Sequence, residues 1–358
     1  MGLCFSRGLR WWMRNIFVDK MAEKIIQYEK KVIFTCSSVY HVLVTMCLIL
    51  ILKNYSDFYV IMFSPVKKDI QSFTFFSKKM SKMGIRNVVI DKHTRLHRAI
   101  GLSSIQNTLI FNKVLRDLHV EKEEYLLVNF AWKKQLVAYP ASIYFKYCYG
   151  AIFIEEGATQ YVTPKENNWY VLLKKIYGNQ TEFWKSEKLI SIFVQFPNRF
   201  PKYLSAKMRG FSWEGVERCL SEKDKKKLIY VFTLNSERKG IWDIRKKPSG
   251  IIFTQPLSED GYITTKKKKE IYKQMTEFYS KYGKTFLKIH PRDTMEYCFA
   301  DVIELRGTYP SELFRILGIK FEFAVGLCTS AIETVEAKQK FNLNENFLTD
   351  LKYEFKYL

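Results

Sequence analysis

The amino-acid sequence predicts an α/β protein of two domains, each built around a parallel sheet. Short apolar runs alternate with amphipathic stretches in both halves of the chain, which is the rhythm of repeated strand–helix–strand units. An irregular stretch and a charged run, Glu222–Lys227, separate the two series. A chain of 358 residues is also long enough for two domains with sizeable cores.

The first series of elements extends over residues 31–222. Strands are expected at Val32–Thr35, Tyr59–Phe63, Asn87–Ile90, Tyr125–Asn129 and Ala151–Glu155. Helices are expected between them at Val39–Lys53, Ile70–Met83 and Leu102–Val120. From Asn167 to about Glu222 the pattern is irregular and rich in aromatic residues, and we expect helices and loops there. This rhythm indicates a parallel sheet that is covered on both faces.

The second series extends over residues 223–358. Strands are expected at Leu228–Thr233, Ile251–Thr254, Thr285–Ile289, Val302–Leu305 and Phe321–Val325. Helices are expected after Gly261, Pro310 and Thr329, and the first of them carries Lys266–Lys269 on its exposed face. The charged run before this series is interpreted as a hinge, with a solvated loop as the alternative. Two Rossmann-like domains facing a central cleft form the GT-B architecture, which is the fold class that we predict.

Composition and charge restrict the classes of partner. Hydrophobic residues make up 47% of the chain and aromatic residues 16%, which excludes a disordered protein. The net charge of +22 would attract an anionic membrane surface or anionic substrates, although a lysine-rich genome would produce the same excess. The lysines are spread along the chain without a zinc-finger, RRM or helix-turn-helix signature, so we do not expect nucleic-acid binding.

Cysteine usage and hydropathy indicate a cytoplasmic protein. Seven scattered cysteines without a C-x-x-C motif argue for a reducing compartment and against a structural zinc site. The apolar run closest to a transmembrane helix, Val39–Leu52, is too short and is predicted to be a buried helix. Residues 1–30 form a basic amphipathic segment in which tryptophans alternate with arginines, as in an interfacial helix. We therefore expect peripheral contact with the inner face of the cell membrane, with Met21 as an alternative start of the chain.

Two polar segments lie at the ends of neighbouring predicted strands. Gln255–Tyr262 follows one strand and Lys288–Arg292 closes the next, with one helix between them. Ligands bind beyond the carboxyl ends of the strands in open α/β sheets, where Asp260 and His290 both fall. A carboxylate can take a proton from an attacking hydroxyl, and an imidazolium can neutralise a departing phosphate. The alternatives are that the acidic turn caps the following helix and that His290 is a buried structural histidine.

These segments resemble glycosyltransferase family 52, the bacterial sialyltransferase-type enzymes of lipooligosaccharide and capsule synthesis. Four motifs occur in the family order, namely QPLSEDGY at 255–262, KIHPRD at 288–293, YPSEL at 309–313 and GLCTSA at 326–331. The segment FTCSSVYH at 34–41 resembles the first strand-to-helix turn of the family. The resemblance implies a GT-B fold, metal-independent transfer and a homodimer. It also implies an acceptor-side domain at 31–222 and a nucleotide-sugar-binding domain at 223–358.

The general base has two candidates. The resemblance assigns this role to Asp260, which would deprotonate the acceptor hydroxyl as its oxygen attacks the anomeric carbon. Glu155-Glu156-Gly157 ends a predicted strand of the first domain, and acid-acid-Gly motifs serve as the base in related bacterial sialyltransferase families. Glu156 is therefore the alternative base, and Glu155 is a candidate for donor binding.

The remaining candidates are expected to hold the donor. His290 would donate a proton or a hydrogen bond to the phosphate as CMP leaves, and Arg292 would add a bidentate contact. Gly261 and Pro291 are expected to lie beside them, and Pro291 restricts His290 to an extended conformation. Predicted helix starts, whose backbone N–H groups favour phosphate, add Ser311, Glu312, Thr329 and Ser330. For both serines N-capping is the alternative.

No metal ion or cofactor is expected. The chain lacks the Asp-x-Asp motif, the P-loop and the G-x-G-x-x-G and G-x-S-x-G motifs. His93 and His97 have the i, i+4 spacing of metal ligands but lack the glutamate of H-E-x-x-H.

The sequence thus predicts an inverting glycosyltransferase. We expect a sialyltransferase that moves sialic acid from CMP-sialic acid to a terminal galactose of a surface polysaccharide or lipooligosaccharide. One alternative keeps the fold and changes the donor, as in a glucosyl- or N-acetylhexosaminyltransferase of the same family. Another alternative is a non-catalytic, membrane-associated protein of polysaccharide assembly, in which the basic surface is the functional feature.

Overall fold

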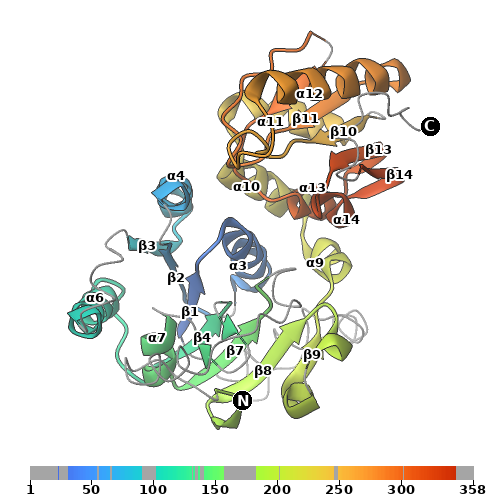
Figure 1. Cartoon of the computed structure of the whole chain (residues 1–358). Coiled ribbons are helices and arrows are strands. Elements are labelled where there is room, and N and C mark those ends of the chain that lie inside the picture. Colours follow the sequence, from blue (N-terminus) through green and yellow to red (C-terminus); the bar gives the residue numbers. More distant parts are fainter. Residues whose placement is uncertain are drawn as a thin grey trace. The chain divides into compact units, whose positions relative to one another are not determined.

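The computed structural model describes residue 23 and residues 31–343, except for positions 55, 65–66, 91–101, 131, 134–135, 138–140, 157–182, 201, 246–248 and 301. The chain divides into two compact units, residues 1–221 and residues 222–358. Each unit contains one large parallel sheet (Figure 1). The N-terminal amphipathic segment apart from residue 23, the pair His93 and His97, and Gly157 lie outside the described residues.

The sheet of the first unit has seven parallel strands in the order β3-β2-β1-β4-β7-β8-β9. They are β1 (Lys31–Cys36), β2 (Phe58–Phe63), β3 (Arg86–Ile90), β4 (Tyr125–Asn129), β7 (Gly150–Ile154), β8 (Leu189–Val194) and β9 (Met208–Gly210). A separate short antiparallel ladder joins β5 (Trp132–Lys133) to β6 (Leu136–Val137). The five strands expected here from the sequence are confirmed. Four of them are almost wholly buried, as apolar runs in a parallel sheet are.

Helices of different character accompany this sheet. The α-helices are α3 (Val39–Leu52), α4 (Lys67–Lys82), α6 (Leu102–Asp117), α7 (Ala141–Tyr147) and α9 (Trp213–Cys219). Short 3₁₀ helices are η3 (Phe183–Lys185), η4 (Pro197–Arg199) and η5 (Lys202–Lys207). Helix α3 is buried along nearly its whole length, as predicted, whereas α4 buries a single stripe. Among the helices of the described residues, none is long and apolar enough to cross a membrane.

The sheet of the second unit has five parallel strands in the order β12-β11-β10-β13-β14. They are β10 (Gly250–Phe253), β11 (Thr285–Lys288), β12 (Val302–Leu305), β13 (Lys320–Leu327) and β14 (Glu336–Leu343). The helices are α10 (Glu222–Phe232), α11 (Asn235–Ile244), α12 (Thr265–Tyr279), η6 (Ser280–Tyr282), α13 (Glu312–Ile316) and α14 (Ala331–Thr334). Helix α12 packs Ile271, Met275 and Tyr279 into the same core as Ile252 and Leu287. Its apolar stripe at helical spacing predicts this packing correctly.

The start of the second unit differs from the prediction. Leu228–Thr233 is not a strand, because residues 228–232 lie in α10. Buried side chains recur there at helical spacing, and Glu222 and Asp224 occupy the first turn, where the helix dipole favours acidic groups. The charged run is therefore not a solvated loop, and the boundary between the two units falls directly before it. It forms the first turns of α10, and Lys225 within it is only 8% exposed.

Strands β8, β9 and β14 are not among the strands predicted from the sequence. The first two lie in the segment for which helices and loops are expected, and they extend the first sheet beyond β7. Strand β14 lies at the edge of the second sheet, and most of its side chains are at least partly exposed. An edge strand buries little apolar surface, so its sequence carries little of the hydrophobic pattern on which strand prediction depends.

Substitution of Gly250 tests the packing at the start of β10. An added Cβ atom would lie 1.8 Å from the ring of Phe323, a fully buried neighbour on β13. We expect Gly250→Ala to lower the free energy of unfolding by about 1–3 kcal/mol through overpacking, measured by urea unfolding. Gly240→Ala in α11 is the control, because its Cβ would meet nothing within 4 Å. Alanine is there expected to stabilise the helix slightly, and equal effects of the two changes would contradict the packing argument.

Candidate active site

A pocket of about 350 Å³ lies at the carboxyl ends of β10, β11 and β13 in the second unit. Small ligands bind at such strand ends in open α/β sheets. The sequence-predicted site residues that line it are His290, Pro291, Ser311, Glu312, Thr329 and Ser330. The other lining residues are Phe253, Thr254, Gln255, Lys288, Ile289, Tyr309, Pro310, Cys328, Ala331 and Thr334.

His290 is held in one orientation by its neighbours. Its backbone N–H donates to Thr254 Oγ1 at 2.9 Å, and its Nδ1 accepts a hydrogen bond from the backbone N–H of Arg292 at 3.1 Å. The proton of the neutral ring is therefore assigned to Nε2. Burial, followed by the positive charges of Arg292 and Lys288, lowers the pKa of His290 to about 4. The imidazolium considered from the sequence is thus not the resting form at neutral pH, and the ring is a neutral hydrogen-bond donor.

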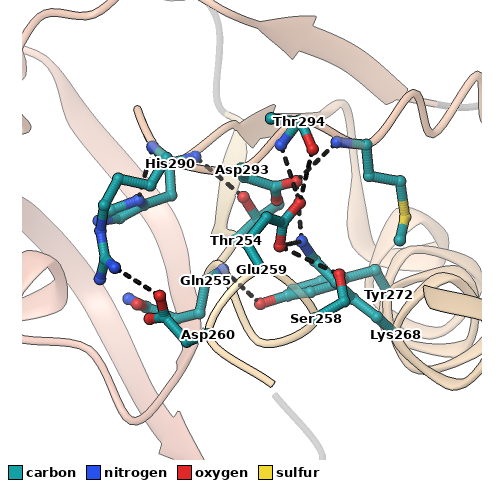
Figure 2. A network of polar contacts seen from close by, with 12 residues as sticks. Thr254, Gln255, Ser258, Glu259, Asp260, Lys268, Tyr272, His290, Asp293 and Thr294 are labelled. Atoms are coloured by element: carbon teal, nitrogen blue, oxygen red, sulfur yellow. Dashed lines mark hydrogen bonds and ion pairs between the residues drawn. The ribbon is translucent and has the colours of Figure 1, made fainter. Parts of the chain in front are cut away.

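Asp260 lies on the turn after β10 and faces the segment that carries His290, but it is not part of the pocket wall (Figure 2). Its Oδ1 lies 2.5 Å from Nη1 of Arg292, in an ion pair at the surface. The turn ends at Gly261, which has a φ of +80°, a backbone conformation that glycine adopts without strain. Helix α12 is capped by Thr264, whose Oγ1 accepts from the backbone N–H of Lys267 at 3.2 Å. The interpretation of the acidic turn as a helix cap is therefore wrong.

Hydroxyl groups supply much of the polar wall of the pocket. Ser311 and Ser330 precede α13 and α14, and neither side chain makes a capping hydrogen bond. Before α14, the Oγ1 of Thr329 accepts a hydrogen bond from the backbone N–H of Ala331 at 3.2 Å. N-capping thus does not account for the two serines. The two helices are only five and four residues long, so the helix-dipole contribution expected at their N-termini is small.

The residues predicted from the sequence do not include three polar residues that support the pocket, namely Thr254, Lys288 and Asn342. Thr254 follows β10 and fixes His290, as described above. Asn342 on β14 accepts from the backbone N–H of Thr329 at 3.2 Å and donates to its carbonyl at 3.1 Å. The position of Thr254 at a predicted strand end was a usable signal, whereas Asn342 lies on a strand that was not predicted.

Lys288 is a buried cation in the pocket wall. Its Nζ donates to the carbonyls of Ile289 at 3.1 Å and Gly307 at 2.6 Å, and it lies 4.3 Å from the centre of the Tyr309 ring. Burial lowers the pKa of Lys288 to about 8, while the charge of Glu237 opposes the shift. The side chain carries a positive charge over most of the neutral pH range, which suits an anionic ligand.

Glu155 and Glu156 belong to the first unit, where β7 ends. The Glu155 side chain is fully buried and accepts from the Tyr40 hydroxyl at 3.3 Å, the backbone N–H of Gln195 at 2.7 Å and the Gln195 amide. These are the contacts of a carboxylate that holds strand ends together within its own unit. Glu156 is half-buried, and a hydrogen bond to its backbone partly offsets the burial that lowers the pKa of His41 to about 3.

The acidic pairs of the two units differ in burial, because Glu155 is fully buried whereas Glu259 is exposed. In each pair the first acid is bound by several donors, Glu155 as described and Glu259 by Lys268 and Thr294. The second acid, Glu156 or Asp260, is more exposed than a core residue. Asp260 shares its unit with the pocket. Within the described part of the chain, no three His, Cys, Asp or Glu side chains are grouped so as to hold a metal ion.

Sequence comparison identifies relatives of the chain. Residues 55–343 match glycosyltransferase family 52. An uncharacterized protein of Haemophilus influenzae is 32% identical over 166 residues, which make up 41% of this chain and 51% of that protein. The chain thus spans about half the length of this relative.

Comparison with solved structures bears on the fold. An α/β-galactoside α-2,3-sialyltransferase from Photobacterium phosphoreum is 13% identical with a TM-score of 0.52, covering 87% of this chain and 91% of that one. A sialyltransferase from Photobacterium damsela is 11% identical with a TM-score of 0.49, covering 86% and 72%. At 13% identity the likeness to the Photobacterium phosphoreum structure concerns the fold alone, and the predicted GT-B class is confirmed. Because the family match covers well over half of the sequence, the protein belongs to glycosyltransferase family 52.

Proposed function

We propose that this glycosyltransferase is an inverting sialyltransferase that moves sialic acid from CMP-sialic acid to a terminal galactose of a bacterial surface polysaccharide or lipooligosaccharide. The observation that carries the proposal is the pocket of the second unit, which joins a neutral histidine, a buried lysine and several hydroxyl groups. CMP-sialic acid carries one phosphate and one carboxylate. A small pocket of hydrogen-bond donors with one cation suits such a donor.

The donor contacts follow from the pocket wall. Ser311, Thr329 and Ser330 would donate hydrogen bonds to the phosphate, with Lys288 supplying positive charge beneath it. Glu312 would accept from the ribose hydroxyls, since a carboxylate is an acceptor and would repel the phosphate. The second unit is then the nucleotide-sugar domain, and the first unit, with Glu156, takes the acceptor side.

The reaction would be a single displacement. The acceptor hydroxyl oxygen forms a bond to the anomeric carbon of sialic acid while the bond from that carbon to the CMP phosphate oxygen breaks. Asp260 accepts the hydroxyl proton, and the leaving phosphate keeps the bonding electron pair. The Nε2–H of His290 donates a hydrogen bond to that phosphate as its charge develops. Attack opposite the leaving group inverts the anomeric configuration.

The proposal is tested by CMP release from CMP-sialic acid, with and without a galactose-terminated acceptor such as lactose. We expect release that depends on the acceptor and is unchanged by EDTA, together with loss of release in His290→Ala, purified in the same way. UDP-glucose, UDP-N-acetylglucosamine and UDP-N-acetylgalactosamine serve as comparison donors. Transfer from a UDP-sugar alone would overturn the sialyl donor. Failure with every donor would favour the non-catalytic alternative.

A further inference from the structure

Helix α12 carries a fully buried lysine that the sequence placed on an exposed face. The side chain of Lys268 is 0% exposed, whereas Lys266 and Lys269 are exposed. Its Nζ lies 2.7 Å from Glu259 Oε2 and 2.8 Å from Asp293 Oδ1 (Figure 2). Burying an ammonium group is costly unless it is paired, and here two carboxylates pair with it. The expectation that Lys266–Lys269 is exposed throughout is therefore wrong for this lysine.

The two carboxylates belong to the two segments that carry the proposed catalytic groups. Glu259 precedes Asp260 on the turn after β10. Asp293 lies three residues after His290, and its backbone N–H donates to the His290 carbonyl at 2.9 Å. The Lys268 ammonium group therefore binds the residue next to Asp260, the proposed base. It also binds the turn that carries His290, the proposed hydrogen-bond donor to the phosphate.

Further hydrogen bonds connect the same two segments directly. Glu259 Oε1 accepts from the backbone N–H of Thr294 at 2.9 Å and from its hydroxyl at 3.0 Å. Within the second segment, Asp293 accepts from the Tyr297 hydroxyl at 2.7 Å and from the backbone N–H of Met295 at 3.0 Å. Every carboxylate oxygen of Glu259 and Asp293 named here has a donor in place, so the buried Asp293 and the partly exposed Glu259 are both well satisfied.

Glu259 is ionised at neutral pH. Burial alone would raise the pKa of Glu259, but hydrogen bonds from Lys268 and Thr294 outweigh it and bring the pKa to about 2. Lys268 thus stands between two carboxylates, Glu259 and Asp293, that would otherwise face each other. Removal of its charge would leave the buried carboxylate of Asp293 facing the partly exposed carboxylate of Glu259 without a cation between them.

We propose that Lys268 is a positioning residue that holds Asp260 and His290 at a set separation by clamping Glu259 and Asp293. The inference rests on the proposed function for the roles of Asp260 and His290, and on the contacts alone for the clamp. Lys268 lies outside the pocket wall, and the proposal gives it no contact with the reacting atoms. Lys268 therefore acts on the distance between Asp260 and His290, which must both reach the same sugar.

The clamp predicts a specific kinetic pattern. Lys268→Met is expected to lower kcat roughly 10-fold to 100-fold, because small misplacements of catalytic groups are costly. The KM for the donor is expected to stay close to the wild-type value, since the hydroxyl groups of the pocket keep their places. The double variant Lys268→Met/Glu259→Gln is expected to recover part of the lost kcat, because one carboxylate then remains where two repelled each other.

Two lysines of the same unit serve as matched controls. Lys225 on α10 is 8% exposed and pairs with Glu222 at 3.5 Å, so Lys225→Met removes a buried lysine at another place. Lys269→Met removes an exposed charge from α12 itself. Both variants are expected to keep the wild-type kcat, and an equal loss in Lys225→Met would mean that general destabilisation explains the effect.

Amide hydrogen exchange tests the clamp independently of activity. Segments 258–263 and 290–297 are expected to exchange faster in Lys268→Met than in wild type, and to be unchanged in Lys225→Met. The kinetic arm uses whichever nucleotide sugar the wild type accepts. If no donor is accepted, the proposed function fails while the exchange result still decides the clamp. Unchanged exchange in these two segments would overturn the inference.

Discussion

Asp260→Asn is expected to lower the kcat for sugar transfer roughly 10²-fold to 10⁴-fold, the range for loss of a general base. The amide is nearly isosteric, so the turn after β10 and the position of Arg292 should persist. The carboxylate that takes the acceptor proton is lost, while the pocket wall keeps its composition. We therefore expect the KM for the donor to change little. Steady-state kinetics with varied donor at saturating acceptor measures both constants.

The rival base supplies the control. Glu156→Gln in the first unit is expected to leave kcat within a small factor of wild type. Loss of transfer in Glu156→Gln together with retained transfer in Asp260→Asn would reverse the assignment and move the base to the first unit. Arg292→Lys tests the contribution of the ion pair separately, because it weakens the contact that holds Asp260 without removing the carboxylate.

His290→Gln is expected to lower kcat roughly 10²-fold to 10³-fold, the cost of losing one donor to a developing oxyanion.

The lowered pKa of His290, about 4, predicts how this residue titrates in the free protein. Its imidazole should titrate well below the ordinary histidine value of about 6.5, so kcat/KM should show no inflection from His290 near that pH. An NMR pH titration of the five histidines, with His290→Gln to assign the signal, measures this directly.

The sign of the associated stability change follows from the same shift. The folded pKa lies below the unfolded one, so the unfolded chain takes up the proton first as the pH falls. His290 therefore lowers the stability of the fold progressively from about pH 6.5 to about pH 4. A titration midpoint near 6.5 in the folded protein would contradict the burial and the positive charges described around this ring.

Most of the fold could be predicted because its signals are local. Apolar runs such as those of β1, β4 and β10 are buried on both faces of a sheet, and their apolar composition predicts this burial. The amphipathic period of α12 likewise predicted a helix with one buried face. Prediction failed at Leu228–Thr233, where a short apolar run was compatible with strand and helix, and at β14, where an edge strand needs little apolar surface.

The candidate site was predictable only in part, and for a related reason. Parallel strands end at one edge of their sheet, so residues after β10, β11 and β13 were expected to meet, and His290, Thr329 and Ser330 do line one pocket. Which polar groups pair across that edge is not a local property.

The amino-acid sequence by itself determined the α/β class, the family and the strand ends that carry the candidate residues, since periodicity and short motifs are properties of neighbouring residues. Only the tertiary structure decided that Lys268 is buried between Glu259 and Asp293, that Asp260 pairs with Arg292, and that Glu155 is bound within its own unit. A lysine in a run of four lysines looks solvated until another loop brings carboxylates to it. The free energy of such a group depends on burial and on partners distant in sequence, and both arise only when the loops come together.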